Sequence, residues 1–161
     1  RKESSAASDV YKRQSLFRTI ILNSFQILLP VFALVFLTYF HIALNAFLIK
    51  KSIQNNELDY KWMKFTPSWQ EIPNDIQSSR ELYKNLFETP LIFYFYCLLA
   101  YNLDHVTILN LSLSWLFVFL RIWHYYVRLQ NPKLSNRRPP FQYSVVVSFF
   151  LWVELLISSL K

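Results

Sequence analysis

The segment LIFYFYCLLAY, Leu91–Tyr101, contains no formally charged side chain and no polar stripe at the ~3.6-residue period of a helix surface. Comparable apolar runs cover residues 16–49, 86–103, 106–127 and 141–160. A spanning helix needs ~20 mostly apolar residues, because lipid offers the backbone no hydrogen-bond partner. The sequence therefore predicts an all-α integral membrane bundle with four spanning helices at about 16–49, 80–103, 106–129 and 141–160. The alternative, a soluble bundle, would need a polar face on each helix.

The composition of the 161-residue chain fits one membrane domain and excludes several classes of enzyme. Hydrophobic residues make up 53% and charged residues 17%, against ~25% charged residues in soluble proteins. Because the sequence has no glycine, it contains no phosphate-binding loop, dinucleotide fingerprint or nucleophile elbow. The single cysteine, Cys97, allows neither an intrachain disulfide nor a cysteine-based zinc site, and we interpret it as a packed thiol.

The N-terminal segment RKESSAASDVYKRQ, residues 1–14, is polar and basic, unlike everything that follows it. It resembles translated adaptor sequence more than part of a folded domain. We therefore expect a non-native or disordered leader over 1–14 and the membrane domain over 15–161.

Basic residues punctuate the apolar runs and gather on one side of the predicted bundle. That side contains Lys50, Lys51, Lys61, Lys64, Arg80, Lys84, Arg128, Lys133, Arg137 and Arg138. Without the leader, the other side has only Arg18 and Lys161. Because Lys and Arg mark the cytoplasmic face, we expect loops 50–84 and 128–140 to be cytoplasmic and both termini to be outside. This distribution argues against nucleic acid as a partner, despite the net charge of +7.

Local signals predict how the helices begin and bend. Pro30 should kink the first helix, and Ser79 should be the N-cap of the second. Pro139 and Pro140 should close the loop that precedes the last helix.

Polar residues near the cytoplasmic ends of the second and third helices are the main functional signal. An ionisable group in a membrane helix costs ~2.5–3.5 kcal/mol, so it normally faces protein or water and has a partner. The second helix has Arg80, Lys84, Asn85 and Glu88 there, and one face of the third has Arg121, His124 and Arg128. We expect Glu88 to meet Arg121, and the set to form a cationic pocket for a small acid with several carboxylates.

A structural interpretation of the same residues stays open. Glu88 and Arg121 would then be an ion pair that specifies the fold. Arg128, Arg137 and Arg138 would be anchors at the membrane surface.

Two other sets of polar residues receive less weight. Glu154 in the fourth helix has no cation nearby in sequence, so we interpret it as a protonated or subunit-interface carboxyl. Haem ligation by histidine is disfavoured, because His105 and His124 fall at opposite ends of the predicted third helix.

Three stretches carry a family resemblance: RELYKNLFETPLIFYFYCLLAY (Arg80–Tyr101), WLFVFLRIWHYYVRL (Trp115–Leu129) and NRRPP (Asn136–Pro140). They resemble the MAPEG family, the membrane-associated proteins in eicosanoid and glutathione metabolism, and within it the short bacterial branch. The resemblance implies a homotrimer of four-helix subunits, with active sites between subunits that open to the cytoplasm. For a protein of this branch it also suggests the bacterial inner membrane, with periplasmic termini.

The resemblance further implies glutathione as a co-substrate and a lipophilic electrophile or lipid peroxide that enters from the bilayer. By resemblance, Arg137 is the catalytic residue, because a nearby cation stabilises a thiolate. The residues implied to hold glutathione are Lys84, Asn85, Glu88, Arg121, His124, Arg128 and Arg138.

Two departures from the family pattern keep a second function open. Arg128 and Phe141 stand where related enzymes have tyrosines, which puts the identity of the ligand in doubt. The alternative function is a non-catalytic membrane scaffold or lipid-binding protein of the same fold.

Overall fold

The computed structural model describes residues 24–59, 72–130 and 133–160, which form a short 3-10 helix and four long α-helices. These elements are η1 Ser24–Leu28, α2 Leu29–Gln54, α3 Asn74–Asn102, α4 Ile108–Gln130 and α5 Leu134–Ser159. The leader expected over residues 1–14 lies outside the described residues.

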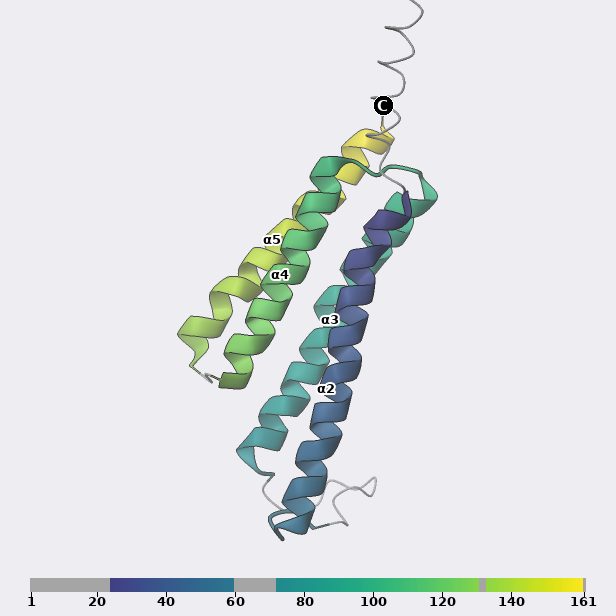
Figure 1. Ribbon diagram of the computed structural model, residues 1–161. Coiled ribbons are helices and arrows are strands. Elements are labelled where there is room, and N and C mark those ends of the chain that lie inside the picture. The colour runs from purple at the N-terminus through teal and green to yellow at the C-terminus, as the bar shows by residue number, and fades with distance from the viewer. Residues whose placement is uncertain (1–23, 60–71, 131–132, 161) are drawn as a thin grey trace, which may run out of the picture.

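The four α-helices run antiparallel and form an elongated bundle (Figure 1). Helix α2 packs mainly against α3, and α4 against α5, while contacts of α2 with α4, and of α3 with α4 and α5, join the two pairs. The ends of α2 and α4 and the starts of α3 and α5 lie together, and we call this the basic end (Figure 1). The α3–α4 connection and the end of α5 form the opposite end. The predicted all-α four-helix bundle is confirmed.

The surface of the bundle is strongly apolar. Large side chains such as Phe36, Phe119 and Phe149 are more than half exposed. The stretches Ser24–Gln54, Ile108–Gln130 and Ser135–Ser159 are long and apolar enough to cross a membrane. Helix α3 is not among them, because its first half is polar, yet it returns the chain from one end of the bundle to the other (Figure 1). The chain is therefore an integral membrane protein.

The first two α-helices begin at other positions than the local signals predicted. Pro30 lies in the first turn of α2, directly after the 3-10 helix η1, a position that does not need its missing N–H. Helix α3 begins at Asn74 with Pro73 as its N-cap residue. Ser79, the expected N-cap, is buried inside the helix, so that prediction is wrong.

The early start of α5 has the largest consequence for the site. The helix begins at Leu134, so Pro139 and Pro140 lie inside it and not in a loop. They are the sixth and seventh residues of α5, past its first turn, so each proline removes one backbone hydrogen bond of the helix. Arg137 and Arg138 therefore project from the first turns of a helix that packs on α4.

The core of the bundle is aromatic and aliphatic. Phe93 of α3 stacks on Phe117 of α4, with ring centroids 4.3 Å apart. Cys97 is fully buried in the same cluster, in agreement with a packed thiol. Because lipid tails are as apolar as these side chains, close packing and polar contacts hold the helices together in a membrane, and the hydrophobic effect contributes little.

His41 links three helices through buried hydrogen bonds, which we call the His41 clasp. Its Nε2 donates to the carbonyl oxygen of Ser79 at 2.9 Å, and its Nδ1 lies 3.1 Å from the hydroxyl of Tyr125. Because a carbonyl oxygen only accepts, the proton is on Nε2 and the Tyr125 hydroxyl donates to Nδ1. The clasp ties α2 to α3 and α4.

Replacing His41 by leucine should lower the free energy of unfolding by about 1–3 kcal/mol, because the Tyr125 hydroxyl would be buried without its partner. The measurement is the midpoint of thermal unfolding in detergent. The control is Phe40→Leu, which changes a neighbouring side chain that is 60% exposed. Equal midpoints for the two variants would show that the clasp contributes nothing.

The described lysines and arginines are concentrated at one end of the bundle. Of the described lysines and arginines, all but Arg121 lie at or near the basic end: Lys50, Lys51, Arg80, Lys84, Arg128, Lys133, Arg137 and Arg138. The described part of the opposite end has Asp104, His105 and Glu154 and no lysine or arginine. This asymmetry along the bundle axis follows the predicted separation of charge.

Candidate functional site

Arg121 is a deeply buried cation that contacts both α3 and α5. Its side chain is 1% exposed, and its Nη2 donates to the backbone carbonyl oxygen of Asn85 at 2.6 Å. The guanidinium also lies over the ring of Phe141, 5.6 Å from the centroid. Its Nε and Nη1 have no hydrogen-bond partner among the described residues. Free donors on a buried guanidinium favour a carboxylate as their partner.

His124, one turn after Arg121, presents a free acceptor. Its Nδ1 lies 2.9 Å from the backbone carbonyl oxygen of Arg137, and since that oxygen only accepts, Nδ1 has the proton. In the neutral ring, Nε2 is then an acceptor, and it is buried with no partner in the described part of the chain. The imidazole can therefore receive a hydrogen bond from a ligand N–H or S–H group.

A cavity of about 180 Å³ lies at the basic end between α3, α4 and α5. It is lined by Asn85, His124, Arg128, Arg137, Arg138 and Phe141. Three of these side chains are guanidinium groups and none is a carboxylate, so the cavity is strongly electropositive. The Nε of Arg128 is also buried without a partner among the described residues. Such a set of donors is suited to an acid with more than one carboxylate.

Five of the eight predicted site residues thus line one cavity: Asn85, His124, Arg128, Arg137 and Arg138. Glu88, Lys84 and Arg121 do not line it, although Arg121 contacts the lining residues Asn85 and Phe141. Glu88 is exposed and forms no ion pair with Arg121 in the described structure, so the predicted meeting of these two residues is wrong. The reason is that Arg121 bonds to a backbone carbonyl of α3 instead. Lys84 is also exposed, and its Nζ lies 3.2 Å from Glu81 Oε1.

Phe141 is a site residue that the sequence singles out only as the replacement of a tyrosine. Its ring contacts Arg121 and lies 5.5 Å from the His124 ring, centroid to centroid. The available signal was spacing, because Arg137 and Phe141 share a face only if the helix begins before the two prolines.

One comparison with known proteins, the comparison with family models, gives a match. The MAPEG family model matches residues 27–157, which is more than half of the chain. Comparison with curated proteins and with solved structures gives no match. The matched region reaches into all four α-helices and contains every residue that lines the cavity. A match of this extent, on a membrane helical bundle, means that the chain belongs to the MAPEG family.

Proposed function

We propose that this protein is a glutathione-dependent transferase or peroxidase that acts on a lipophilic electrophile or lipid peroxide in the membrane. Family membership supports a glutathione-related function in general. The observation that carries the specific proposal is the electropositive cavity with its three guanidinium groups. Glutathione has two carboxylates, an ammonium and a thiol, so it can use guanidinium donors together with the acceptor at His124 Nε2.

Arg137 is the proposed catalytic residue. Its half-buried side chain lines the cavity, and its backbone carbonyl accepts the hydrogen bond from His124. A cation beside a thiol lowers the thiol pKa and so favours the thiolate near neutral pH. The sulfur would then form a bond to the electrophilic carbon while the leaving group departs with its electron pair.

We further propose a homotrimer in which a neighbouring subunit completes the site. The cavity of about 180 Å³ is smaller than the ~300–1,000 Å³ of pockets that enclose whole small-molecule ligands. One chain would therefore surround only part of glutathione. Lys84 and Glu88, which are exposed on α3, would be available to the ligand once a second subunit closes this side.

The proposed orientation places the basic end in the cytoplasm of a bacterial cell and the opposite end in the periplasm. Eight of the nine described lysines and arginines lie at or near the basic end, with Arg121 as the ninth. Positive residues mark the cytoplasmic side of membrane proteins. Glutathione would then reach the cavity from the cytoplasm.

Isothermal calorimetry of the full chain in detergent should show saturable glutathione binding with a Kd below about 1 mM, the upper range of enzyme KM values. The affinity should fall as salt rises, because the proposed contacts are charged. Arg128→Ala should weaken binding about tenfold or more by removing a charge-assisted hydrogen bond. An absence of heat at millimolar glutathione would favour the scaffold or lipid-binding alternative.

A further inference from the structure

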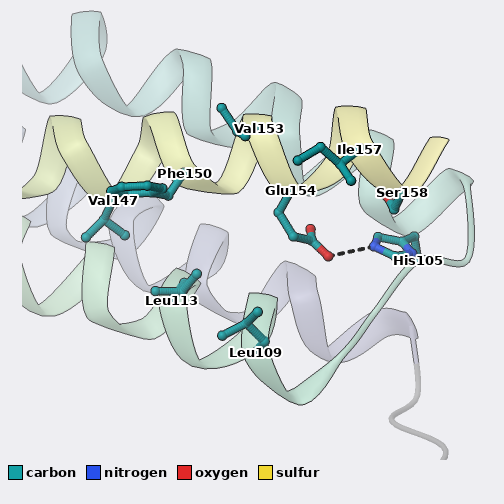
Figure 2. A pocket seen from close by; sticks show the side chains of 9 residues that line it. All are labelled: His105, Leu109, Leu113, Val147, Phe150, Val153, Glu154, Ile157 and Ser158. Atoms are coloured by element: carbon teal, nitrogen blue, oxygen red, sulfur yellow. Dashed lines mark hydrogen bonds and ion pairs between the residues drawn. The ribbon is translucent and has the colours of Figure 1, made fainter. Parts of the chain in front are cut away.

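A second, larger cavity lies at the opposite end of the bundle, between α4 and α5 (Figure 2). Its volume is about 730 Å³. Leu109, Leu113, Val147 and Phe150 form aliphatic and aromatic walls, whereas His105 and Glu154 lie together at one end (Figure 2). The cavity therefore has an apolar body and a polar head.

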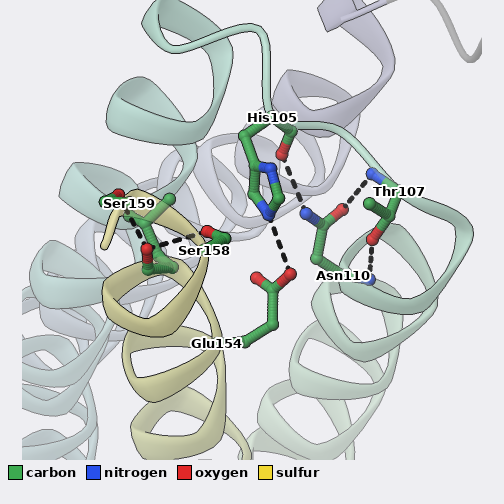
Figure 3. A network of polar contacts seen from close by, with 7 residues as sticks. His105, Thr107, Asn110, Glu154, Ser158 and Ser159 are labelled. Atoms are coloured by element: carbon green, nitrogen blue, oxygen red, sulfur yellow. Dashed lines mark hydrogen bonds and ion pairs between the residues drawn. The ribbon is translucent and has the colours of Figure 1, made fainter. Parts of the chain in front are cut away.

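Hydrogen bonds hold the side chains of the polar head in place. His105 Nε2 lies 2.8 Å from Glu154 Oε1 (Figure 2). The backbone at His105 is held by Asn110, whose Nδ2 donates to the His105 carbonyl oxygen at 2.9 Å (Figure 3). Asn110 and Thr107 in turn exchange side-chain and backbone hydrogen bonds at the start of α4 (Figure 3). His105 is thus fixed although it lies in a connection between helices.

One atom of this head is left unsatisfied. Glu154 Oε2 is buried and has no hydrogen-bond partner among the described residues. A buried carboxylate oxygen without a donor is costly, so a ligand with an N–H or O–H group would stabilise it. The described charged groups at this end are Asp104, His105 and Glu154, with no lysine or arginine. This charge distribution favours a ligand whose hydrogen-bond donor is positively charged over a negatively charged ligand.

The apolar body can hold the part of one lipid chain nearest its headgroup. Its α5 wall extends from Val147 to Glu154 of the polar head, about 10 Å at ~1.5 Å per residue. This is about two thirds of the depth of one leaflet, which is half of the ~30 Å hydrocarbon layer of a bilayer. The polar head lies at the end of the bundle, where a lipid headgroup would be.

We propose that the cavity binds a membrane lipid with an ammonium headgroup. The ammonium donates to Glu154 Oε2, and one acyl chain lies along the apolar walls between α4 and α5. This site is separate from the proposed glutathione site and does not depend on it.

Native mass spectrometry of the full chain, titrated with phosphatidylethanolamine and phosphatidylglycerol of identical acyl chains, tests the proposal. We expect saturable binding of one phosphatidylethanolamine per chain, about tenfold tighter than phosphatidylglycerol. Val153→Trp, which fills the cavity, should weaken phosphatidylethanolamine binding about tenfold, the effect of excluding about two methylene groups. Val146→Trp is the matched control, since Val146 is 49% exposed and lies outside the cavity. Glu154→Gln should remove the preference between the two lipids.

Leu109→Trp fills the cavity from the α4 wall and replaces Val153→Trp if that variant does not fold. Equal binding of the two lipids by the unmodified protein would overturn the proposal. So would equal effects of the cavity and control tryptophans. A change of oligomeric state in the cavity variants, without a change in lipid binding, would show that a second copy of the chain occupies this cavity instead of a lipid.

Discussion

Arg137→Ala should abolish most of the thiolate absorbance of bound glutathione at neutral pH while the protein stays assembled. Removing an adjacent positive charge moves a pKa by ~1–3, so the ionised fraction of the thiol should fall about tenfold or more. The fold should tolerate the change, because the structural contact of Arg137 is its backbone carbonyl, which accepts from His124 Nδ1. Alanine retains that carbonyl.

Ultraviolet difference spectra of the glutathione complex provide the measurement, and size-exclusion chromatography reports on assembly. Lys50→Ala is the matched control, since it removes one charge from an exposed position at the basic end that does not line the cavity. The control should keep the full thiolate signal. An unchanged signal in Arg137→Ala would remove the catalytic assignment from Arg137, and Arg128 would be the next candidate in the same cavity.

The number and order of the α-helices could be predicted because long apolar runs leave few alternatives in a membrane. The residues at which the helices begin are harder to predict than their number. Pro139 and Pro140 are strong loop signals, but α5 begins at Leu134 and includes both of them past its first turn. Ser79 is a good N-cap residue by type, but the helix already begins at Asn74, and Ser79 instead contributes its carbonyl to the His41 clasp.

The composition of the candidate site was predicted better than its contacts. His124 and Arg128 are four residues apart on α4, so helical periodicity alone places them together. The contact between Arg121 and the Asn85 carbonyl could not be predicted in this way, because every residue has a carbonyl group and the sequence does not indicate which one is reached. Glu88 seemed a better partner for Arg121 only because it is an acid.

The cavity with the polar head was missed for a related reason. Glu154 was interpreted alone, since no cation lies near it in sequence. Its partner, His105, is 49 residues away and meets it only because α4 and α5 form an antiparallel pair. Contacts between distant segments depend on the packing of whole helices, which the local pattern does not determine.

Arg121→Met should leave the ligand-free protein as stable as before, or more stable by up to about 2 kcal/mol, while glutathione binding falls at least about tenfold. The guanidinium is 1% exposed and has no carboxylate partner in the described structure. Its desolvation costs several kcal/mol, which the bond to the Asn85 carbonyl and the contact with Phe141 offset only in part. Methionine fills a similar volume without that cost.

The stability and binding measurements together distinguish a ligand-binding arginine from a structural one. A buried arginine that serves the ligand destabilises the protein while the site is empty. In Arg121→Met the ligand-free thermal midpoint should therefore not fall. The rise in that midpoint on adding glutathione should disappear, because the ligand no longer binds. Lys50→Met, a substitution at an exposed position, should change neither quantity. If Arg121→Met instead lowers the ligand-free stability by more than about 3 kcal/mol, Arg121 already has its partner in the assembled protein, since breaking a buried ion pair costs that much. The free donors of Arg121 would then belong to a subunit contact and not to glutathione.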